Sequence, residues 1–171
     1  TLHQVFHTRI MRNVLLFLGM AFTWSGCQPS SPSIRHVELP CSVRSFDILG
    51  QKHIRFAGSN GWVGQSLDRG ATWEMTQWMA PDSTFPSFRA SGHSDSHWHA
   101  VGIASPAWIA RSPTSSLEPE WIYHSEDSNM FLDAMAWLDA DRAVVFGDET
   151  EGCFTLLTTP VSYTHLRAHE T

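Results

Sequence analysis

A histidine-rich segment in the middle of the chain holds the densest cluster of side chains that could carry out chemistry. His93, Asp95, His97 and His99 alternate with other residues. In an extended strand, alternate residues share one face, so three imidazoles and a carboxylate could together bind zinc or copper. A turn from His93 to Ser96 would break that common face and leave the imidazoles in a line instead of converging on one point. We therefore expect a polar strand and turn here, and no functional metal site.

The segment SLDRGATW, residues 66–73, identifies the elements that must position such side chains. Ser66 can end a strand, and Asp68 can fold its carboxylate back onto nearby backbone N–H groups. Gly70 can adopt the positive φ of a tight turn. Thr72 suits the start of the next strand, and Trp73 can cover the hairpin with apolar surface. The pattern resembles the Asp-box repeat of many β-propellers, a structural device found in proteins of unrelated function.

A repeat of 46 residues supports this interpretation. Residues 59–66 and 105–112 both read S-x-x-W-(V/I)-small-polar-S. Trp73 has a counterpart in Trp121, although the second connection lacks the Asp and Gly of the first, and Phe131 opens a third unit. Propeller blades repeat every ~40–50 residues and contain four strands each, so the period fits.

The sequence therefore predicts an all-β chain that forms an incomplete β-propeller of about three four-stranded antiparallel blades, the last one truncated. The propeller repeats occupy residues 34–159, with blades at about 43–78, 87–124 and 131–159. The predicted strands are 43–48, 53–57, 62–66, 72–78, 87–92, 97–104, 107–112, 120–124, 131–138, 142–147 and 153–159. Residues 66–73 should connect strands three and four of the first blade.

Both ends of the chain differ from the repeats. Residues 1–10 are predicted to be non-native upstream translation, and residues 11–26 have the charged start and short apolar core of a lipoprotein signal peptide. The signal ends at WSGC, so Cys27 would carry the lipid, and residues 27–33 would form a polar tether. Residues 160–171 are predicted to be artefactual, because VSYTHLRAHET resembles a translated sequencing adaptor. The protein would be secreted across the inner membrane and anchored in the bacterial envelope, either periplasmic or at the outer membrane.

Composition narrows the class of protein further. The chain has 171 residues, a formal charge of −6 and 42% hydrophobic residues, which is too apolar for disorder and too poor in basic charge for a nucleic-acid surface. It contains no dinucleotide fingerprint, CxxC or haem motif, so we expect no cofactor. Cys41 and Cys153 could pair in an oxidising compartment, but two separate thiols are expected.

Two further segments resemble a known family. FLDAMAW (131–137) and FGDETEGCF (146–154) are similar to the "f-x-D-A-M-x-F/W … G-D-P-x-x-G" signature of Asp-box propellers related to the photosystem II stability and assembly factor, which include secreted bacterial proteins. Glu149 stands where proline is usual. The residues that match the signature are Asp133, Met135, Gly147, Asp148 and Gly152. Asp133 is expected on the first strand of its blade, which lines the propeller axis, and Asp148 on a turn, both bracing the backbone through hydrogen bonds.

The resemblance implies a non-catalytic envelope scaffold that uses a propeller face for protein binding or for the assembly or stability of a complex. One alternative is a sialidase-like or other glycan hydrolase, because sialidases share the Asp-box propeller. That chemistry needs an arginine cluster, a tyrosine nucleophile with a glutamate, and an aspartate acid/base. The arginines here are scattered over the blades, and Tyr123 is the only tyrosine before the predicted adaptor. A second alternative is an oxidoreductase, a label that some bacterial relatives carry.

Overall fold

The computed structural model describes residues 34–103, 106–125, 127–140, 142–150, 153–158 and 167–168. The chain divides into the units Thr1–Val37 and Glu38–Thr171, and the second unit contains every strand described below. Among the described residues, none belongs to a helix that is long and apolar enough to span a bilayer. The predicted signal peptide, Cys27 and Gly152 lie outside the described residues.

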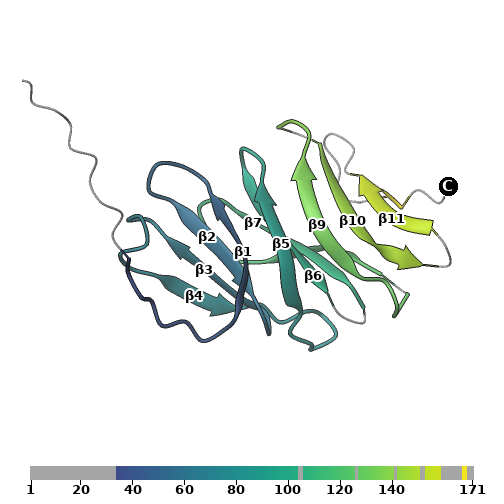
Figure 1. Cartoon of the computed structure of the whole chain (residues 1–171), viewed down its shortest axis with the longest axis horizontal. Coiled ribbons are helices and arrows are strands. Elements are labelled where there is room, and N and C mark those ends of the chain that lie inside the picture. Colours follow the sequence, from purple (N-terminus) through teal and green to yellow (C-terminus); the bar gives the residue numbers. More distant parts are fainter. Residues whose placement is uncertain are drawn as a thin grey trace, which may run out of the picture. The chain divides into compact units, whose positions relative to one another are not determined.

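The second unit is built from three antiparallel sheets, each a meander in chain order (Figure 1). The first contains β1 (Val43–Ile48), β2 (Ile54–Gly58), β3 (Trp62–Ser66) and β4 (Glu74–Gln77). The second contains β5 (Ser87–His93), β6 (His97–Ile103), β7 (Trp108–Pro113) and β8 (Glu120–His124). The third contains β9 (Leu132–Trp137), β10 (Ala143–Thr150), β11 (Cys153–Thr158) and β12 (Arg167–Ala168). The predicted meanders are confirmed, and the connection between β3 and β4 is the predicted one.

The strand ends differ from the prediction in two informative places. β10 continues to Thr150 past the expected end at Gly147, because Glu149 and Thr150 still pair with β11. Asp148 therefore lies within a strand, and its predicted place on a turn is wrong. The fourth strand of the third sheet is β12, which pairs with β11 and lies within residues 160–171, the segment predicted to be artefactual.

The sheets pack through two apolar seams that repeat the same strand positions. The inner strands β2, β3, β6 and β7 are buried because neighbouring sheets cover them. The first seam, between the first and second sheets, contains Ala57, Val63, Trp78, Phe88, Trp98, Ala100 and Ala110. The second seam, between the second and third sheets, contains Val101, Ala107, Ile109, Leu132, Val145 and Leu157. These seams hold the blades and their connecting loops in place.

Each first strand carries a β-bulge at the same point. The residue without a partner on the second strand is Arg44 in β1, Arg89 in β5 and Asp133 in β9. Next to each bulge, the second strand has a glycine: Gly58, Gly102 and Gly147. A Cβ atom at any of the three would collide with the chain segment that enters the blade. The repeat therefore specifies a close backbone approach, and with it the place where the bulge residue projects.

The two outer faces of the unit remain uncovered by described residues, as an open arc of blades requires. Phe46 and Ile48 on β1 are 69% and 59% exposed, and Phe154 on β11 is 77% exposed. Such apolar faces are an aggregation hazard in an isolated set of blades.

Candidate functional site

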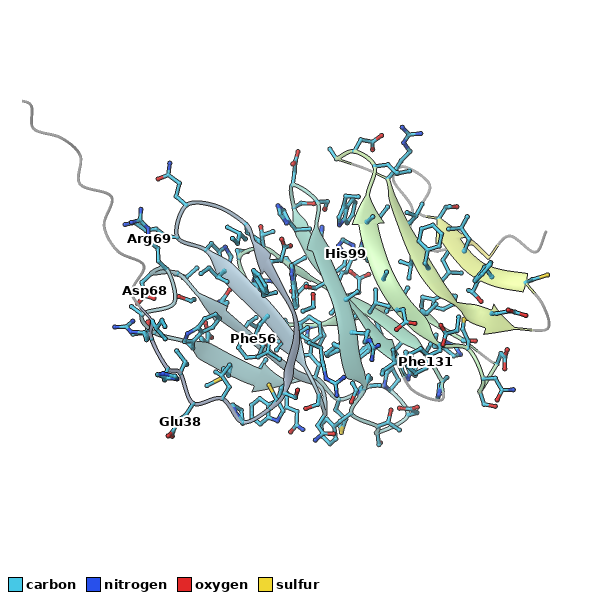
Figure 2. All side chains as sticks on the ribbon, viewed as in Figure 1. Glu38, Phe56, Asp68, Arg69, His99 and Phe131 are labelled. Carbon is cyan, nitrogen blue, oxygen red and sulfur yellow. The ribbon has the colours of Figure 1, made fainter. Side chains whose placement is uncertain are left out.

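The turn from Ser66 to Trp73 is held together by the Asp68 carboxylate (Figure 2). Asp68 accepts hydrogen bonds from the Thr72 amide at 2.8 Å, from the Thr72 hydroxyl at 2.7 Å and from the Ser66 hydroxyl at 2.8 Å. Gly70 has a φ of 82°, and its amide donates to the Ser66 hydroxyl. The Trp73 ring lies 5.4 Å from that of Phe56. The hydrogen bonds of Ser66, Asp68, Gly70 and Thr72 are made to one another within the turn, so its geometry serves the hairpin.

The pH dependence of stability tests this role of Asp68. Hydrogen bonds, first that from the Thr72 amide, lower the pKa of Asp68 from 3.8 to about 2. A depressed carboxylate pKa stabilises the fold above the unfolded value, and this contribution is lost as the pH falls toward the folded value. We expect Asp68→Ala to show a smaller fall in the urea midpoint between pH 4 and pH 2 than the wild type. Asp95→Ala, in an exposed turn, is the control, and equal slopes for Asp68→Ala and wild type would contradict the role.

A buried arginine, which the sequence analysis did not single out, joins the first two blades. Arg55 in β2 is fully buried, and its guanidinium lies 5.5 Å from the Trp98 ring centroid. It donates hydrogen bonds to the Gln65 side-chain oxygen, the Ser112 hydroxyl and the main-chain oxygens of Pro113, Thr114 and Ser116. Burial lowers the pKa of Arg55 to about 10, so the side chain stays charged at neutral pH. Arg55 thus fixes the connection between β7 and β8.

The histidines of the central segment have different neighbours, although the His97 and His99 rings lie 6.4 Å apart on β6. His93 ends β5, and its Nδ1 lies 2.7 Å from an Asp47 carboxylate oxygen in the first blade. His97 begins β6 and interacts with the Ser96 hydroxyl, whereas His99 is buried against Trp137. Burial lowers the pKa of His99 to about 4. Among the described residues, no three His, Cys, Asp or Glu side chains are placed to hold a metal ion.

A polar cleft opens over the first seam, at the end where β1 and β2 are connected. We call it the seam cleft; it has a volume of about 420 Å³. Its lining residues are Leu49, His53, His93, Ser94, Asp95, Thr114 and Ser115. Burial, with smaller effects from the Arg55 and His93 charges, lowers the pKa of His53. The cleft brings together one histidine from each of two blades, His53 and His93.

The bulge residues Arg44, Arg89 and Asp133 form a second polar feature, here named the bulge row. The Arg89 Nε lies 3.2 Å from an Asp133 oxygen in an ion pair, and its guanidinium lies 5.9 Å from the Phe131 ring centroid. Burial and the neighbouring Asp148 carboxylate raise the pKa of Asp133, and Arg89 opposes this effect. Arg44 is exposed, and no hydrogen bond or ion pair to it occurs among the described residues. The row places two arginines and one aspartate at equivalent positions of adjacent first strands.

A groove of about 600 Å³ runs along the outer strand of the first blade. We call it the β4 groove. One wall is β4 with Trp78 and Met79, and the other is the connection from Ser115 to Pro119. The Trp78 indole N–H donates to the Leu117 carbonyl at 2.7 Å and joins the two walls. The groove therefore depends on contacts between blades.

Comparison with known proteins identifies the arrangement of blades. No protein-family model and no curated protein matches the chain. A solved structure of YCF48 bound to D1 peptide superposes on 77% of this chain with a TM-score of 0.62 and 16% sequence identity. The chain is an incomplete β-propeller. The superposition covers 41% of the YCF48 chain, so the propeller described here spans about two fifths of that length.

The described residues that match the family signature pack against the core or hydrogen-bond to the backbone. Met135 packs against the second seam, and the Asp148 amide donates to the Phe131 carbonyl at 2.8 Å. Gly147 lies too close to the Phe131 carbonyl to accept a side chain. Cys41 and Cys153 form no disulfide with each other. The signature thus lies around the bulge of the third blade.

The groups required for a sialidase reaction are separated among the described residues of the propeller. Arg44 and Arg89 lie on first strands, whereas Tyr123 lies on β8, the outer strand of its blade. The Tyr123 hydroxyl contacts the Met130 sulfur, and burial raises its pKa. A nucleophilic tyrosine needs the opposite shift and a neighbouring base. These residues therefore do not form a glycosidase site.

Proposed function

We propose that this chain is part of a bacterial envelope lipoprotein that uses propeller blades to bind a protein partner and assist the assembly or stability of a complex. The proposed role is binding without catalysis. The observation that carries it is the fold match to a propeller whose solved structure has a peptide bound. Fold alone does not define a function, so the polar features of this chain must supply the contacts.

The guanidinium groups of the bulge row support the proposed binding role. Guanidinium groups bind carboxylates through paired hydrogen bonds, and they are enriched at the centres of protein interfaces. The side chains of Arg89 and Asp133 are 42% and 34% exposed, so both can reach a partner as well as each other. An ion pair this exposed contributes little to folding, typically about 0–1 kcal/mol. Arg89 lies on the strand next to that of the exposed Arg44, a position that fits recognition better than stability.

The experiment tests anchoring and partner binding in the same cells. The chain is produced from Met11 in a Gram-negative host with a photo-crosslinking phenylalanine analogue at position 89. We expect lipid mass on Cys27, partition into detergent, and a discrete crosslinked product in the envelope fraction. Cys27→Ser should remove the lipid mass and the detergent partition, because the thiol carries the anchor.

The matched control carries the same analogue at position 69, because Arg69 is an exposed turn residue of the first blade and lies outside the bulge row. Position 69 should give no discrete product. Equal products at both positions, or none at position 89, would overturn the binding role. Equal membrane recovery of the Cys27→Ser variant would overturn the anchor and leave the binding role to be judged by the crosslinks.

A further inference from the structure

We propose that the β4 groove binds an extended basic segment of a partner protein, which adds to the first blade as a fifth strand. The inference rests on the proposed function in one respect, namely that the partner is a protein. It assigns a site separate from the bulge row. Three features of the first blade support it: an open strand edge, a preformed groove beside that edge, and the charge of the groove.

The open edge belongs to β4. Within the described residues, β4 pairs with β3 and with no other strand. The Trp78 amide donates to the Gly61 carbonyl at 2.8 Å, so the peptide groups of residue 78 point toward β3. In an antiparallel pair this direction alternates along the strand, which turns the peptide groups of Met75 and Gln77 outward. An incoming strand can therefore use two N–H donors and two carbonyl acceptors.

The groove gives this edge a second wall. The connection from Ser115 to Pro119 faces β4 and is held by the Trp78 hydrogen bond to Leu117 and by Arg55, which donates to the Ser116 carbonyl at 2.7 Å. Because both anchors are buried side chains of the first blade, the wall is in place before any ligand arrives. A preformed site avoids part of the entropy cost of ordering a loop on binding.

The charge of the groove selects a basic segment. Glu74 and Glu118 contribute two carboxylates to its lining, and no lysine or arginine is among its lining residues. The chain as a whole carries a formal charge of −6, which favours the approach of a cation. Met75 and Met79 are 37% and 55% exposed and offer adaptable apolar contacts. A bound strand that alternates basic and apolar side chains would satisfy both sets of contacts.

The test uses two blocked peptides, one alternating lysine and valine and the other alternating glutamate and valine, each labelled for fluorescence polarisation with the full chain. We expect the lysine peptide to bind and the glutamate peptide to bind at least about tenfold more weakly. Gln77→Pro removes one outward N–H and should weaken lysine-peptide binding about tenfold. Gln77→Ala keeps that N–H and should bind within about twofold of wild type.

A surface variant keeps the test independent of folding. Glu118→Gln should weaken binding about threefold, whereas Glu38→Gln, an exposed carboxylate outside the groove, should leave it unchanged. Amide exchange at Met75 and Gln77 should slow when the lysine peptide is bound. Equal affinity for both peptides, or unchanged affinity in Gln77→Pro, would overturn the groove site. If this happens while position 89 still crosslinks, the groove is refuted and the proposed function stands.

Discussion

Replacing Arg55 with methionine is expected to lower the free energy of unfolding by about 3–5 kcal/mol, because the substitution leaves several buried acceptors without a donor. The Gln65 and Ser112 side chains lose their bonds to Arg55, and so do the carbonyls that form the start of the β7–β8 connection. The stability of Arg55→Lys should fall between those of Arg55→Met and the wild type, since one compact ammonium group cannot reach all the acceptors around the edge of the planar guanidinium. Urea unfolding at pH 7, followed by tryptophan fluorescence, measures the difference.

Arg69→Met is the matched control, because Arg69 is exposed and its Nε donates only to the Gln51 carbonyl at 3.2 Å. Its effect should stay within about 0.5 kcal/mol. A loss below about 1 kcal/mol for Arg55→Met would show that the network relaxes or is hydrated. Arg55 also holds the wall of the β4 groove. The folded Arg55→Met variant, at pH 7 without urea, should therefore bind the lysine peptide more weakly than the wild type does.

The meanders were predictable because their determinants are local. β1 (Val43–Ile48), β3 (Trp62–Ser66) and β8 (Glu120–His124) have the predicted bounds. The Asp68 turn fixes the start of β4, and the 46-residue repeat places the same residue types on successive blades. The same spacing relates Asp47 to His93, which are hydrogen-bonded across the first seam. The repeat therefore carries information on contacts between blades as well as on strand positions.

The polar features between blades were not predictable, because they depend on register and on the path of a loop. Arg55 meets Ser112 at a separation of 57 residues, a distance that differs from the repeat. The sequence does contain one indication of this role of Arg55. It lies in the central strand IRFAG, and a charged residue buried on a central strand needs several hydrogen-bond partners. Prediction of the bulge row would also have required the register of strand pairing. Arg44 and Asp133 are of opposite charge, so the bulge positions give no repeated sequence pattern.

Trp78→Ala is expected to produce a loss of stability as large as that of Arg55→Met, by a different mechanism. Trp78 is 1% exposed and packs edge-on against Phe88 and Trp98, with ring centroids 5.7 and 5.8 Å away. Removing a buried tryptophan costs about 3–5 kcal/mol, because the seam loses apolar contact and is left with a cavity. Met79→Ala, at the next residue and 55% exposed, should change the free energy of unfolding by less than about 0.5 kcal/mol.

Trp78→Phe separates packing from the hydrogen bond that joins the walls of the β4 groove. Phenylalanine keeps most of the apolar contact but has no donor for the Leu117 carbonyl, so the expected loss is about 1–2 kcal/mol. The variant should remain folded, while the connection from Ser115 to Pro119 loses one of its two anchors. Hydrogen exchange should then be faster in that connection and unchanged in β6. Unchanged exchange in the connection would mean that Arg55 alone holds the wall, and the lysine peptide should then bind Trp78→Phe as it binds the wild type.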